Sequence, residues 1–413
     1  MSRPGSPPAF GHAMRAEWAL DPDILYLNHG TVGAPPRRVL QAQQAIRDEI
    51  ERQPSRFLLR ELSSISVGVK PPDVPRMRAA ANAVAAFLGA RGEDLVFVDN
   101  VTSGVNAVLR SLEFLPDDEI VVTSDAYGAV VKTARYVARR AGAHVRVAEL
   151  PDAAADPQEF VEAIAAALTP RTRVAIIEHV AAESALVLPL AALAARCQAA
   201  GVMVLADGAH APGAIPVDLP ALGVDWYAAN LHKWAWSPRS CGILWAPPER
   251  QADLHPPVIS WGLDQGFADE FDWTGTRDPS AALAAPVGIA FMQELGVDAV
   301  RAYNHALAWD GANRLAARWG TSLARTEPWI GTMATIPLPT AAGETPEDAL
   351  RLRDRLLFED HIEAPIHAHR GRLQVRISAQ IYNETSDLDR LAEAVERAVS
   401  PAGAGRGGAG MTS

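Results

Sequence analysis

Short apolar runs alternate with longer segments of helical spacing through the middle of the chain. The apolar runs have the length of buried strands, and the segments between them repeat apolar residues every three or four positions. The predicted strands are residues 94–99, 119–124, 144–150, 173–180 and 202–210, and the predicted helices are 103–112, 129–142, 156–168 and 189–201. Strands and helices that alternate in this way are typical of βαβ units and a mostly parallel sheet. The pattern therefore predicts an α/β fold.

A second pattern near the C-terminus predicts a smaller lobe. Residues 371–378 alternate as a strand, and 382–399 have helical spacing, with Thr385 or Ser386 as the candidate N-cap. A long helix at 35–53 could pack beside this lobe. The expected organisation is a disordered N-terminus (1–15), an N-terminal segment packing on the small domain (16–60), a large domain (61–290), a small C-terminal α+β domain (291–400) and a disordered tail (401–413).

Composition narrows the class of protein. The chain has 413 residues, of which 48% are hydrophobic and 21% charged, as in an ordinary globular enzyme subunit. Its net charge of −11 argues against a nucleic-acid binder. With no signal-peptide pattern and no apolar run long enough to span a membrane, we expect a cytoplasmic protein. Cys197 and Cys241 are too few for a disulfide framework and lack metal-ligand spacing, so we expect buried packing and no metal.

Lysine is scarce in this chain. Only Lys70, Lys132 and Lys233 occur among 38 lysines and arginines, so 38 − 3 = 35 of these residues are arginine. Arginine is thus the residue used wherever only a positive charge is needed. Lys70 lies in a proline-broken loop and Lys132 in the middle of a predicted helix, whereas Lys233 lies between a histidine and a tryptophan after an apolar run. This placement indicates chemistry that requires a primary amine.

Polar residues that follow three of the apolar runs support this interpretation. Thr102, Ser103 and Gly104 stand where a strand gives way to a helix, a position that suits an anion, although threonine and serine are also ordinary N-caps. Asp207 ends a buried strand, where a carboxylate needs a cation or a donor unless it only caps a turn. Lys233 follows the next strand, where burial would make its amine nucleophilic, unless it lies at the surface.

The three features together fit pyridoxal phosphate better than any of them does alone. The helix start would hold the phosphate, Asp207 would keep the ring nitrogen protonated, and Lys233 would form an imine with the cofactor aldehyde. His210, three residues after Asp207, could stack on the ring or hydrogen-bond nearby.

At this point the chain resembles a known family, the class V aminotransferase fold of pyridoxal-phosphate enzymes, and within it the isopenicillin N epimerase-like branch. The matching segments are residues 26–40, 100–109, 178–190, 206–213, 230–234, 271–281 and 372–391, which follow the order seen in the family. The resemblance implies the aspartate aminotransferase-like fold, with a large cofactor domain and a small C-terminal α+β domain.

The resemblance also implies roles for individual residues. Those implied to bind the cofactor are Lys233, Asp207 with its neighbour His210, the phosphate contacts Thr102, Ser103, Gly104, Asn230 and His232, and the ring-stacking Tyr127. Gly275 and Thr276 are implied to reach the phosphate of the other subunit, which implies a homodimer with a shared active site. Arg376 would bind the substrate α-carboxylate, with Asn28 and His29 lining the substrate side. As alternatives, Tyr127 could be a surface residue and Arg376 part of a salt bridge.

One segment departs from the family pattern. Where relatives carry a serine or asparagine that hydrogen-bonds the phenolic oxygen of the cofactor, this chain has Ala182, followed by Glu183 and Ser184. Either another side chain supplies the donor or the cofactor is tuned differently, so the departure weakens the expectation of ordinary transamination.

The expected reaction begins with removal of the Cα proton of an amino acid by the Lys233 amine. The fates favoured by the resemblance are β-elimination (a C–S lyase) or epimerisation of an S-substituted cysteine or peptide-like amino acid in secondary metabolism, such as antibiotic biosynthesis. The alternatives are an aminotransferase, an oxidative or decarboxylating deaminase, and a non-catalytic binding or regulatory protein with the same fold. A cysteine desulfurase is disfavoured because no cysteine follows Cys241.

Overall fold

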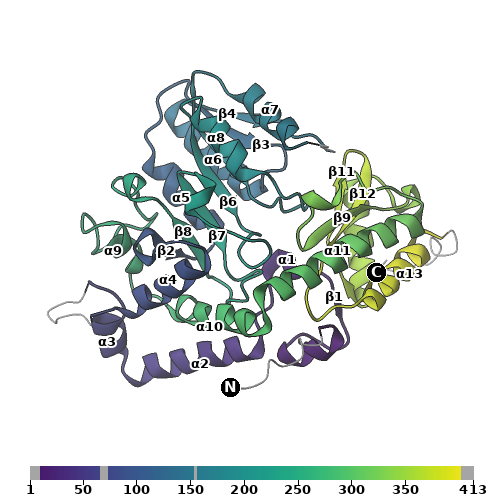
Figure 1. Cartoon of the computed structure of the whole chain (residues 1–413), viewed down its shortest axis with the longest axis horizontal. Coiled ribbons are helices and arrows are strands. Elements are labelled where there is room, and N and C mark those ends of the chain that lie inside the picture. The colour runs from purple at the N-terminus through teal and green to yellow at the C-terminus, as the bar shows by residue number, and fades with distance from the viewer. Residues whose placement is uncertain (1–9, 66–72, 153–155, 401–413) are drawn as a thin grey trace, which may run out of the picture. The chain divides into compact units, whose positions relative to one another are not determined.

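The computed structural model describes residues 10–65, 73–152 and 156–400, which form two compact units (Figure 1). The described residues of the smaller unit fall within Met1–Thr31, Glu183–Leu186 and Asp298–Ser413. Those of the larger unit fall within Val32–Ala182 and Val187–Val297. The predicted tail (401–413), residues 1–9 of the predicted disordered N-terminus and Lys70 lie outside the described residues.

A seven-stranded sheet forms the core of the larger unit, in the order β2-β8-β7-β6-β5-β3-β4. Its strands are β2 (Leu95–Val98), β3 (Glu119–Thr123), β4 (His144–Ala148), β5 (Thr172–Glu178), β6 (Met203–Gly208), β7 (Trp226–Asn230) and β8 (Gly242–Trp245). The sheet is parallel except around β8, which runs antiparallel to both β2 and β7. All five strands predicted from the apolar runs are present, which confirms the predicted α/β class.

Helices cover this sheet because each carries one apolar stripe. The four that follow strands β2 to β5 are α5 (Val101–Ser111), α6 (Gly128–Ala141), α7 (Pro157–Ala167) and α8 (Leu190–Gln198). Helix α5 packs on β6, β7 and β8 through buried residues such as Val105 and Val108, and α8 packs on β5 and β6. The α6 helix ends at Gly142, whose φ of 73° is a left-handed cap that glycine adopts readily. Strand carboxyl ends and helix starts therefore meet at one edge.

The N-terminal segment is divided between the units. Residues up to Thr31 belong to the smaller unit, whereas helix α2 (Arg37–Arg52), which was predicted at 35–53, belongs to the larger unit and packs on α10 (Ser280–Leu295). The other helices of the larger unit are α3 (Pro54–Arg56), α4 (Arg76–Phe87) and α9 (Phe267–Asp272). The division falls at Val297, where the sequence predicted a domain boundary at residue 290.

A three-stranded antiparallel sheet, in the order β11-β12-β9, forms the core of the smaller unit. Its strands are β9 (Met333–Pro337), β11 (Ile366–His369) and β12 (Arg372–Ser378), and β1 (Leu25–Tyr26) pairs separately with β10 (Ile362–Glu363). The helices are α11 (Val297–Trp319, in this unit from Asp298), α12 (Pro346–Phe358) and α13 (Thr385–Val399). Leu315, Leu356 and Leu391 contribute apolar side chains from the three helices to the same core.

Helix α13 begins one residue earlier than the sequence predicted. The N-cap is Glu384, not Thr385 or Ser386, because Glu384 and Asp387 form a capping box. The Glu384 side chain accepts from the Asp387 backbone N–H, and the Asp387 side chain accepts from the Glu384 backbone N–H. The prediction was wrong because it considered only hydroxyl side chains.

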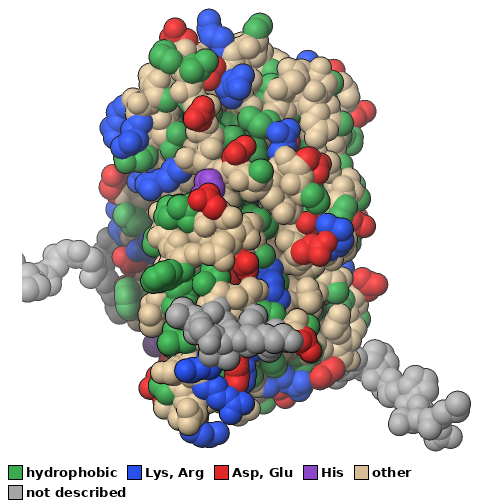
Figure 2. Space-filling model, turned by 90° about the vertical axis from the view of Figure 1, so that its left-hand side faces the viewer, with side chains coloured by type: hydrophobic (Ala, Val, Ile, Leu, Met, Phe, Trp, Pro, Cys, Tyr) green, Lys and Arg blue, Asp and Glu red, His purple; other side chains and the backbone are tan. Residues whose placement is uncertain are grey.

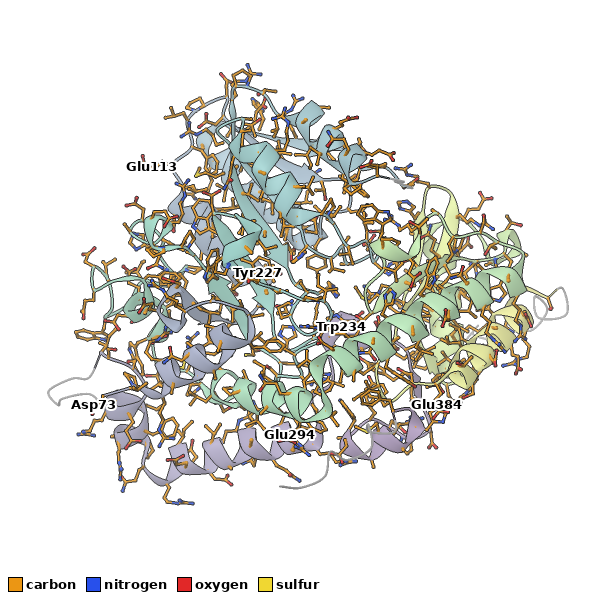
Figure 3. The ribbon with its side chains drawn as sticks, viewed as in Figure 1. Asp73, Glu113, Tyr227, Trp234, Glu294 and Glu384 are labelled. Atoms are coloured by element: carbon orange, nitrogen blue, oxygen red, sulfur yellow. The ribbon has the colours of Figure 1, made fainter. Side chains whose placement is uncertain are left out.

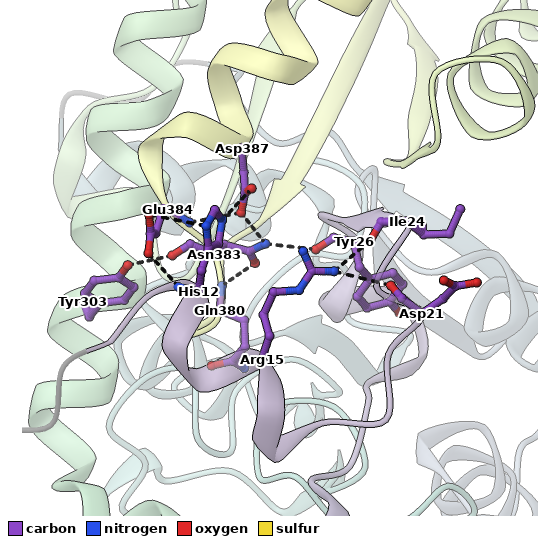
Figure 4. Close-up of polar contacts among 10 residues, drawn as sticks. All are labelled: His12, Arg15, Asp21, Ile24, Tyr26, Tyr303, Gln380, Asn383, Glu384 and Asp387. Carbon is purple, nitrogen blue, oxygen red and sulfur yellow. Dashed lines mark hydrogen bonds and ion pairs between the residues drawn. The ribbon is translucent and has the colours of Figure 1, made fainter.

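The same helix start binds the N-terminal 3-10 helix η1 (His12–Glu17) of the smaller unit (Figure 4). The His12 backbone N–H donates to Glu384 at 2.6 Å, and the His12 ring lies 2.9 Å from the Asp387 carboxylate. Arg15 donates to the Ile24 carbonyl at 3.1 Å. His12, within the segment predicted to be disordered, is thus held by the start of α13.

Candidate cofactor site

Polar residues gather at the carboxyl edge of the large sheet, where parallel-sheet enzymes place their ligands. Asp207 lies at the end of β6, Asn230 ends β7 and Glu178 ends β5. Figure 3 shows Tyr227 on β7 and Trp234 in the loop that follows it. The sequence predicted the first two of these strand ends as functional and gave no role to the third.

The start of helix α5 is fixed against β7 by two asparagines. Asn100 accepts from the Ser103 N–H at 3.0 Å as the N-cap, and Asn230 accepts from the Val101 N–H at 3.0 Å. A Cβ on Gly104 would lie 2.9 Å from the Ala228 side chain, so glycine lets the helix approach the strand closely. The first turn of α5 is therefore held rigidly at the sheet edge, with the positive end of the helix dipole facing outward.

Asn230 has a structural role besides the phosphate contact that the resemblance implied, and that contact stays a prediction. Its side-chain oxygen already accepts from the backbone of α5, so in this chain Asn230 orients the helix start. Asn100 was missed by sequence reasoning, although its position just before a Val-Thr-Ser-Gly helix start is a typical N-cap signal.

Asp207 is a buried carboxylate that suits a cationic partner. Asp207 is only 2% exposed, and its carboxylate accepts a hydrogen bond from the Ala209 N–H at 2.9 Å. Burial raises the pKa of Asp207, while the Ala209 N–H and the charge of Lys233 act in the opposite direction. A protonated ring nitrogen bound here would offset the desolvation of the carboxylate.

Lys233 contacts His210 in the loop that follows β6. The Lys233 Nζ lies 2.9 Å from His210 Nε2, and the Trp234 indole N–H donates to His210 Nδ1 at 3.4 Å. An indole N–H can only donate, so Nδ1 of His210 accepts from Trp234 and Nε2 is left to contact the Lys233 amine. His210 therefore holds the Lys233 side chain at the sheet edge.

Close backbone packing fixes the lysine loop. A Cβ on Gly33, whose φ is 66°, would lie 1.7 Å from the His232 carbonyl oxygen. A Cβ on Gly213, whose φ is 90°, would lie 2.3 Å from the Trp234 carbonyl oxygen. Both positions require glycine, and the fully buried Trp236 anchors the end of the loop.

His232 is held by the backbone beside it. Its Nδ1 lies 3.0 Å from the Cys241 carbonyl, so Nδ1 carries the hydrogen and donates. Burial lowers the pKa of His232 to about 4, which makes the ring neutral at pH 7. The Nε2 of this neutral ring is an acceptor, so the implied contact with a phosphate requires the ring to take up a proton on binding.

Three further predicted residues of the larger unit lie in exposed or half-exposed positions. Tyr127 precedes helix α6 and is 52% exposed, Gly275 adopts a φ of 112°, and Thr276 is exposed. Their roles in ring stacking and in the partner's phosphate site stay predictions.

The smaller unit holds Arg376 in a preformed polar cluster. Arg376 on β12 is 3% exposed and donates from Nη2 to the Thr31 hydroxyl at 2.7 Å and to Asn28 at 3.3 Å. Burial lowers the pKa of Arg376 to about 10, so it stays cationic at pH 7. Asn28 also donates to Glu363 at 2.7 Å. Thr31 was missed, although it lies in the same Asn-His-Gly-Thr segment.

His29 and Ala182 have roles that the resemblance did not describe. His29 is fully buried, with Nδ1 2.9 Å from the Tyr382 hydroxyl, so its predicted contact with a substrate stays a prediction. Ala182 offers no side-chain donor, and its neighbour Glu183 uses its backbone carbonyl to accept from Thr335 at 3.0 Å. Ser184 accepts from the Leu186 N–H at 3.4 Å.

The other lysine that the structure describes and the two cysteines have no features of reactive residues. Lys132 is exposed on α6, and the buried Cys197 and Cys241 confirm the prediction of packing roles. Burial raises the pKa of these thiols to about 11 and about 12, so neither is a reactive thiolate at pH 7. Within the described ranges, no three His, Cys, Asp or Glu side chains gather as metal ligands would. Among the same residues, no single helix has the length and apolar composition needed to cross a membrane.

Comparisons with known proteins identify the family of this chain. The Aminotransferase class-V family model matches residues 73–391. The chain is 33% identical to an isopenicillin N epimerase of Streptomyces clavuligerus, over 92% of this chain and 96% of that protein. It is 32% identical to a probable chloroplastic L-cysteine desulfhydrase of Arabidopsis thaliana, over 91% of this chain and 83% of that protein.

Solved structures share the fold. The cystine C–S lyase C-DES, in complex with its product cysteine persulfide, matches with a TM-score of 0.74 at 20% identity, over 91% of this chain and 97% of that one. The cysteine desulfurase CsdA of Escherichia coli matches with a TM-score of 0.72 at 21% identity, over 94% of this chain and 98% of that one. With a family match over most of its length and relatives above 30% identity along nearly all of it, the chain belongs to the class-V aminotransferase family of pyridoxal-phosphate enzymes.

Proposed function

We propose that this protein is a pyridoxal-phosphate-dependent C–S lyase that eliminates the sulfur substituent of an S-substituted cysteine. The observation that carries the proposal is the contact between Lys233 Nζ and His210 Nε2, beside the buried Asp207 at the sheet edge. It holds the amine of Lys233 near the carboxylate that would meet the ring nitrogen of the cofactor. Support comes from the L-cysteine desulfhydrases among the relatives.

The residues of the larger unit fit the cofactor. The first turn of α5, at Thr102, Ser103 and Gly104, would hold the phosphate with the His232 ring, and Asp207 would hold the ring nitrogen. Lys233 would bind the aldehyde carbon. When bound, pyridoxal phosphate accepts the electron pair that Cα keeps when its proton leaves.

In this proposal Lys233 moves one proton between two substrate atoms. Once the substrate amine has displaced it, the Lys233 amine takes the proton from Cα, so a C–H bond breaks and an N–H bond forms. The Cβ–S bond then breaks, and the Lys233 ammonium returns the proton to the departing sulfur. His210 holds Nζ in place between these transfers. Addition of water to the remaining fragment gives pyruvate and ammonia, so a cysteine thioether and water yield a thiol, pyruvate and ammonia.

We also propose roles for residues of the smaller unit and of a second subunit. Arg376, oriented by Thr31 and Asn28, would bind the substrate α-carboxylate in a bidentate manner. His29 would support the same side through Tyr382. We propose that Gly275 and Thr276 serve the partner's phosphate in a homodimer, and that Tyr127 stacks on the ring. We further propose a cytoplasmic enzyme that acts on modified cysteines of secondary metabolism, such as antibiotic biosynthesis.

Product analysis tests the reaction. The purified protein is incubated with L-cysteine, cystine and S-alkyl cysteines, and pyruvate, ammonia and released thiol are measured. We expect equal amounts of the three products and a complete loss in the Lys233→Ala variant, which should also lose the yellow colour of bound cofactor. Unbroken substrate after many hours, in a protein that is yellow and bleached by borohydride, would reject the lyase.

Epimerisation is the second candidate, favoured by the 33% identity to the Streptomyces clavuligerus epimerase. In D2O an epimerase would place deuterium at Cα without releasing pyruvate, whereas a lyase releases pyruvate. A keto acid formed from the intact substrate would identify an aminotransferase or a deaminase. A colourless protein that binds no cofactor would indicate the non-catalytic alternative. The fold is shared with cysteine desulfurases, but no cysteine follows Cys241 to act as their nucleophile.

A further inference from the structure

A second buried carboxyl group lies beside Asp207. Glu178 ends β5, and its Cα pairs with that of Asp207 in the parallel register of β5 and β6, so both side chains stand on the same face of the sheet. Glu178 is 2% exposed. Its Oε2 accepts from the Thr123 hydroxyl at 2.5 Å, and its Oε1 has no hydrogen-bond partner in the described part of the chain.

The charged groups around Glu178 are unfavourable to its ionised form. Asp207 on β6 and Asp125, just after β3, both act on it as negative charges. Its chain neighbour His179 bonds instead with the Tyr227 hydroxyl at 2.9 Å, and burial lowers the pKa of His179 to about 4, so that ring is neutral. No ion pair joins Glu178 to a lysine, arginine or histidine among residues 10–65, 73–152 and 156–400. The hydrogen bonds that favour the ionised form of Glu178 come from the Thr123 hydroxyl and from its own backbone.

Two adjacent buried carboxyl groups cannot both ionise cheaply, so one of them holds a proton. Asp207 has the Ala209 N–H and the nearby charge of Lys233 to stabilise its anion. Glu178 lacks both, and burial together with Asp207 raises the pKa of Glu178 to about 8.

We propose that Glu178 is a positioning residue of the cofactor site, which holds a neutral carboxyl group beside Asp207 so that Asp207 carries the single negative charge that meets the ring nitrogen. The proposal rests on the proposed function for the ring nitrogen, but the protonation of Glu178 is independent of the reaction. Ionised Glu178 would share or compete for the proton of the cofactor ring. Neutral Glu178 leaves that proton between the ring and Asp207.

Infrared spectroscopy of the full-length protein without cofactor tests the protonation directly. At pH 6.5 the wild type should show the carbonyl band of a protonated carboxylic acid, which should disappear by pH 9.5 and be absent from Glu178→Gln. The matched control is Glu119→Gln. Glu119 is a 3% exposed carboxylate at the other end of β3, where burial is outweighed by hydrogen bonds from Thr169 and Arg171 that lower its pKa, so this variant should keep the band.

A second variant guards against misfolding of Glu178→Gln. The Thr123 hydrogen bond lowers the pKa of Glu178, so Thr123→Val should move the midpoint of the same band to higher pH. A wild-type spectrum without the band at pH 6.5, or a band that survives in Glu178→Gln, overturns the proposal.

Cofactor binding tests the consequence for the site. The dissociation constant of pyridoxal phosphate, measured by absorbance, should differ by less than fivefold between wild type and Glu178→Gln at pH 6.5, because both side chains are neutral. Above pH 8 the wild type should bind progressively more tightly than the variant, because only Glu178 gains a negative charge near the protonated ring. A fivefold or larger loss at pH 6.5, or identical pH profiles, overturns the positioning role. Failure of the wild type to bind cofactor at all would sink the proposed function while leaving the infrared result intact.

Discussion

At the scale of single residues, Glu178 gives the large unit an unusual dependence of stability on pH. The pKa of Glu178 is raised from 4.5 to about 8 in the folded chain, chiefly by burial and then by Asp207. The folded state therefore binds more protons than the unfolded state between these values, and stability falls as pH rises through this window. Within this window the folding equilibrium constant falls tenfold for each pH unit, which lowers the unfolding free energy by about 1.4 kcal/mol.

This sign gives the first prediction. Glu178→Gln removes the titrating proton, so between pH 5 and pH 8 its unfolding free energy should fall less steeply than that of the wild type. Urea unfolding at pH 5.5 and pH 7.5 measures the loss of unfolding free energy over this interval. We expect this loss to be about 2 kcal/mol larger in the wild type than in Glu178→Gln. Parallel pH curves for the two proteins would contradict it. Glu119→Gln again serves as the control from the same sheet.

A second prediction concerns Arg376. Replacing it with lysine keeps the charge but loses the fork of donors that Thr31 and Asn28 orient, so kcat/KM should fall about 100-fold, which corresponds to about 3 kcal/mol. Arg372→Lys is the control, since Arg372 lies on the same strand and donates to the Leu338 carbonyl at 3.0 Å. Steady-state kinetics with any accepted substrate would show the contrast. Equal effects of the two changes would remove Arg376 from the substrate site.

At the scale of elements, the lysine loop depends on how closely other backbone segments approach it. Gly33→Ala would place a methyl group against the His232 carbonyl at a position whose φ is already 66°. We expect a loss of more than about 3 kcal/mol in stability, together with weaker binding of cofactor, because the loop that carries Lys233 must move.

Gly223 provides a matched control for this third prediction. Its φ is also 66°, but a Cβ there would meet nothing within 4 Å. Gly223→Ala should therefore cost only the left-handed strain, about 1 kcal/mol, and leave cofactor affinity unchanged. Thermal unfolding and absorbance titration of both variants separate the cost of the left-handed backbone from the steric clash of the methyl group with the His232 carbonyl. Similar losses for both would show that the loop tolerates the methyl group.

The start of α13 gives a fourth prediction at this scale. Glu384→Ala removes both the N-cap and a contact of the 3-10 helix η1, so stability should fall by about 1–2 kcal/mol. Thr385→Ala, at one of the two residues that the sequence pattern offered as the cap, should change stability by less than about 0.5 kcal/mol. Urea unfolding of the two variants distinguishes them, and the reverse order would contradict the capping box.

The elements also show where sequence reasoning succeeds and where it stops. Five strands and the residues that follow them were predictable because apolar runs and polar strand ends alternate in order along the chain. Asn100, Thr31 and Glu178 were missed for different reasons. The Asn100 cap is a local signal that the sequence reasoning overlooked. The hydrogen bond between residues 31 and 376 and the register between neighbouring strands depend on contacts that no single stretch of sequence contains. The Ala182 departure was visible in the sequence, but what compensates for it was not.

At the scale of the whole molecule, charged side chains of both signs are interspersed, whereas several exposed apolar side chains are concentrated in one stretch of the chain. Figure 2 shows acidic and basic side chains interspersed over one face, in a chain whose net charge is −11. In contrast, the stretch 258–263 exposes several apolar side chains close together in sequence, with Trp261 73% exposed and Val258 59% exposed. Such surface is typical of contacts between proteins, and we assign it to the proposed homodimer.

The fifth prediction follows from this assignment. Trp261→Glu should weaken the dimer at least tenfold, or about 1.4 kcal/mol, by placing a charge in an apolar contact. Phe358→Glu is the control, because Phe358 is equally exposed, at 73%, on α12 of the smaller unit. Light scattering across a dilution series measures both. A Trp261→Glu protein that remains as dimeric as the control would remove this loop from the interface.

The chain passes from one unit to the other four times, after Thr31, Ala182, Leu186 and Val297. Neither unit is therefore encoded by one uninterrupted stretch of the gene. Separate expression of a single lobe would need artificial joins, and a cut at the last crossing would leave the N-terminal fragment carrying two orphaned pieces of the smaller lobe. Engineering of hybrid enzymes should accordingly exchange individual surface loops and leave whole lobes intact.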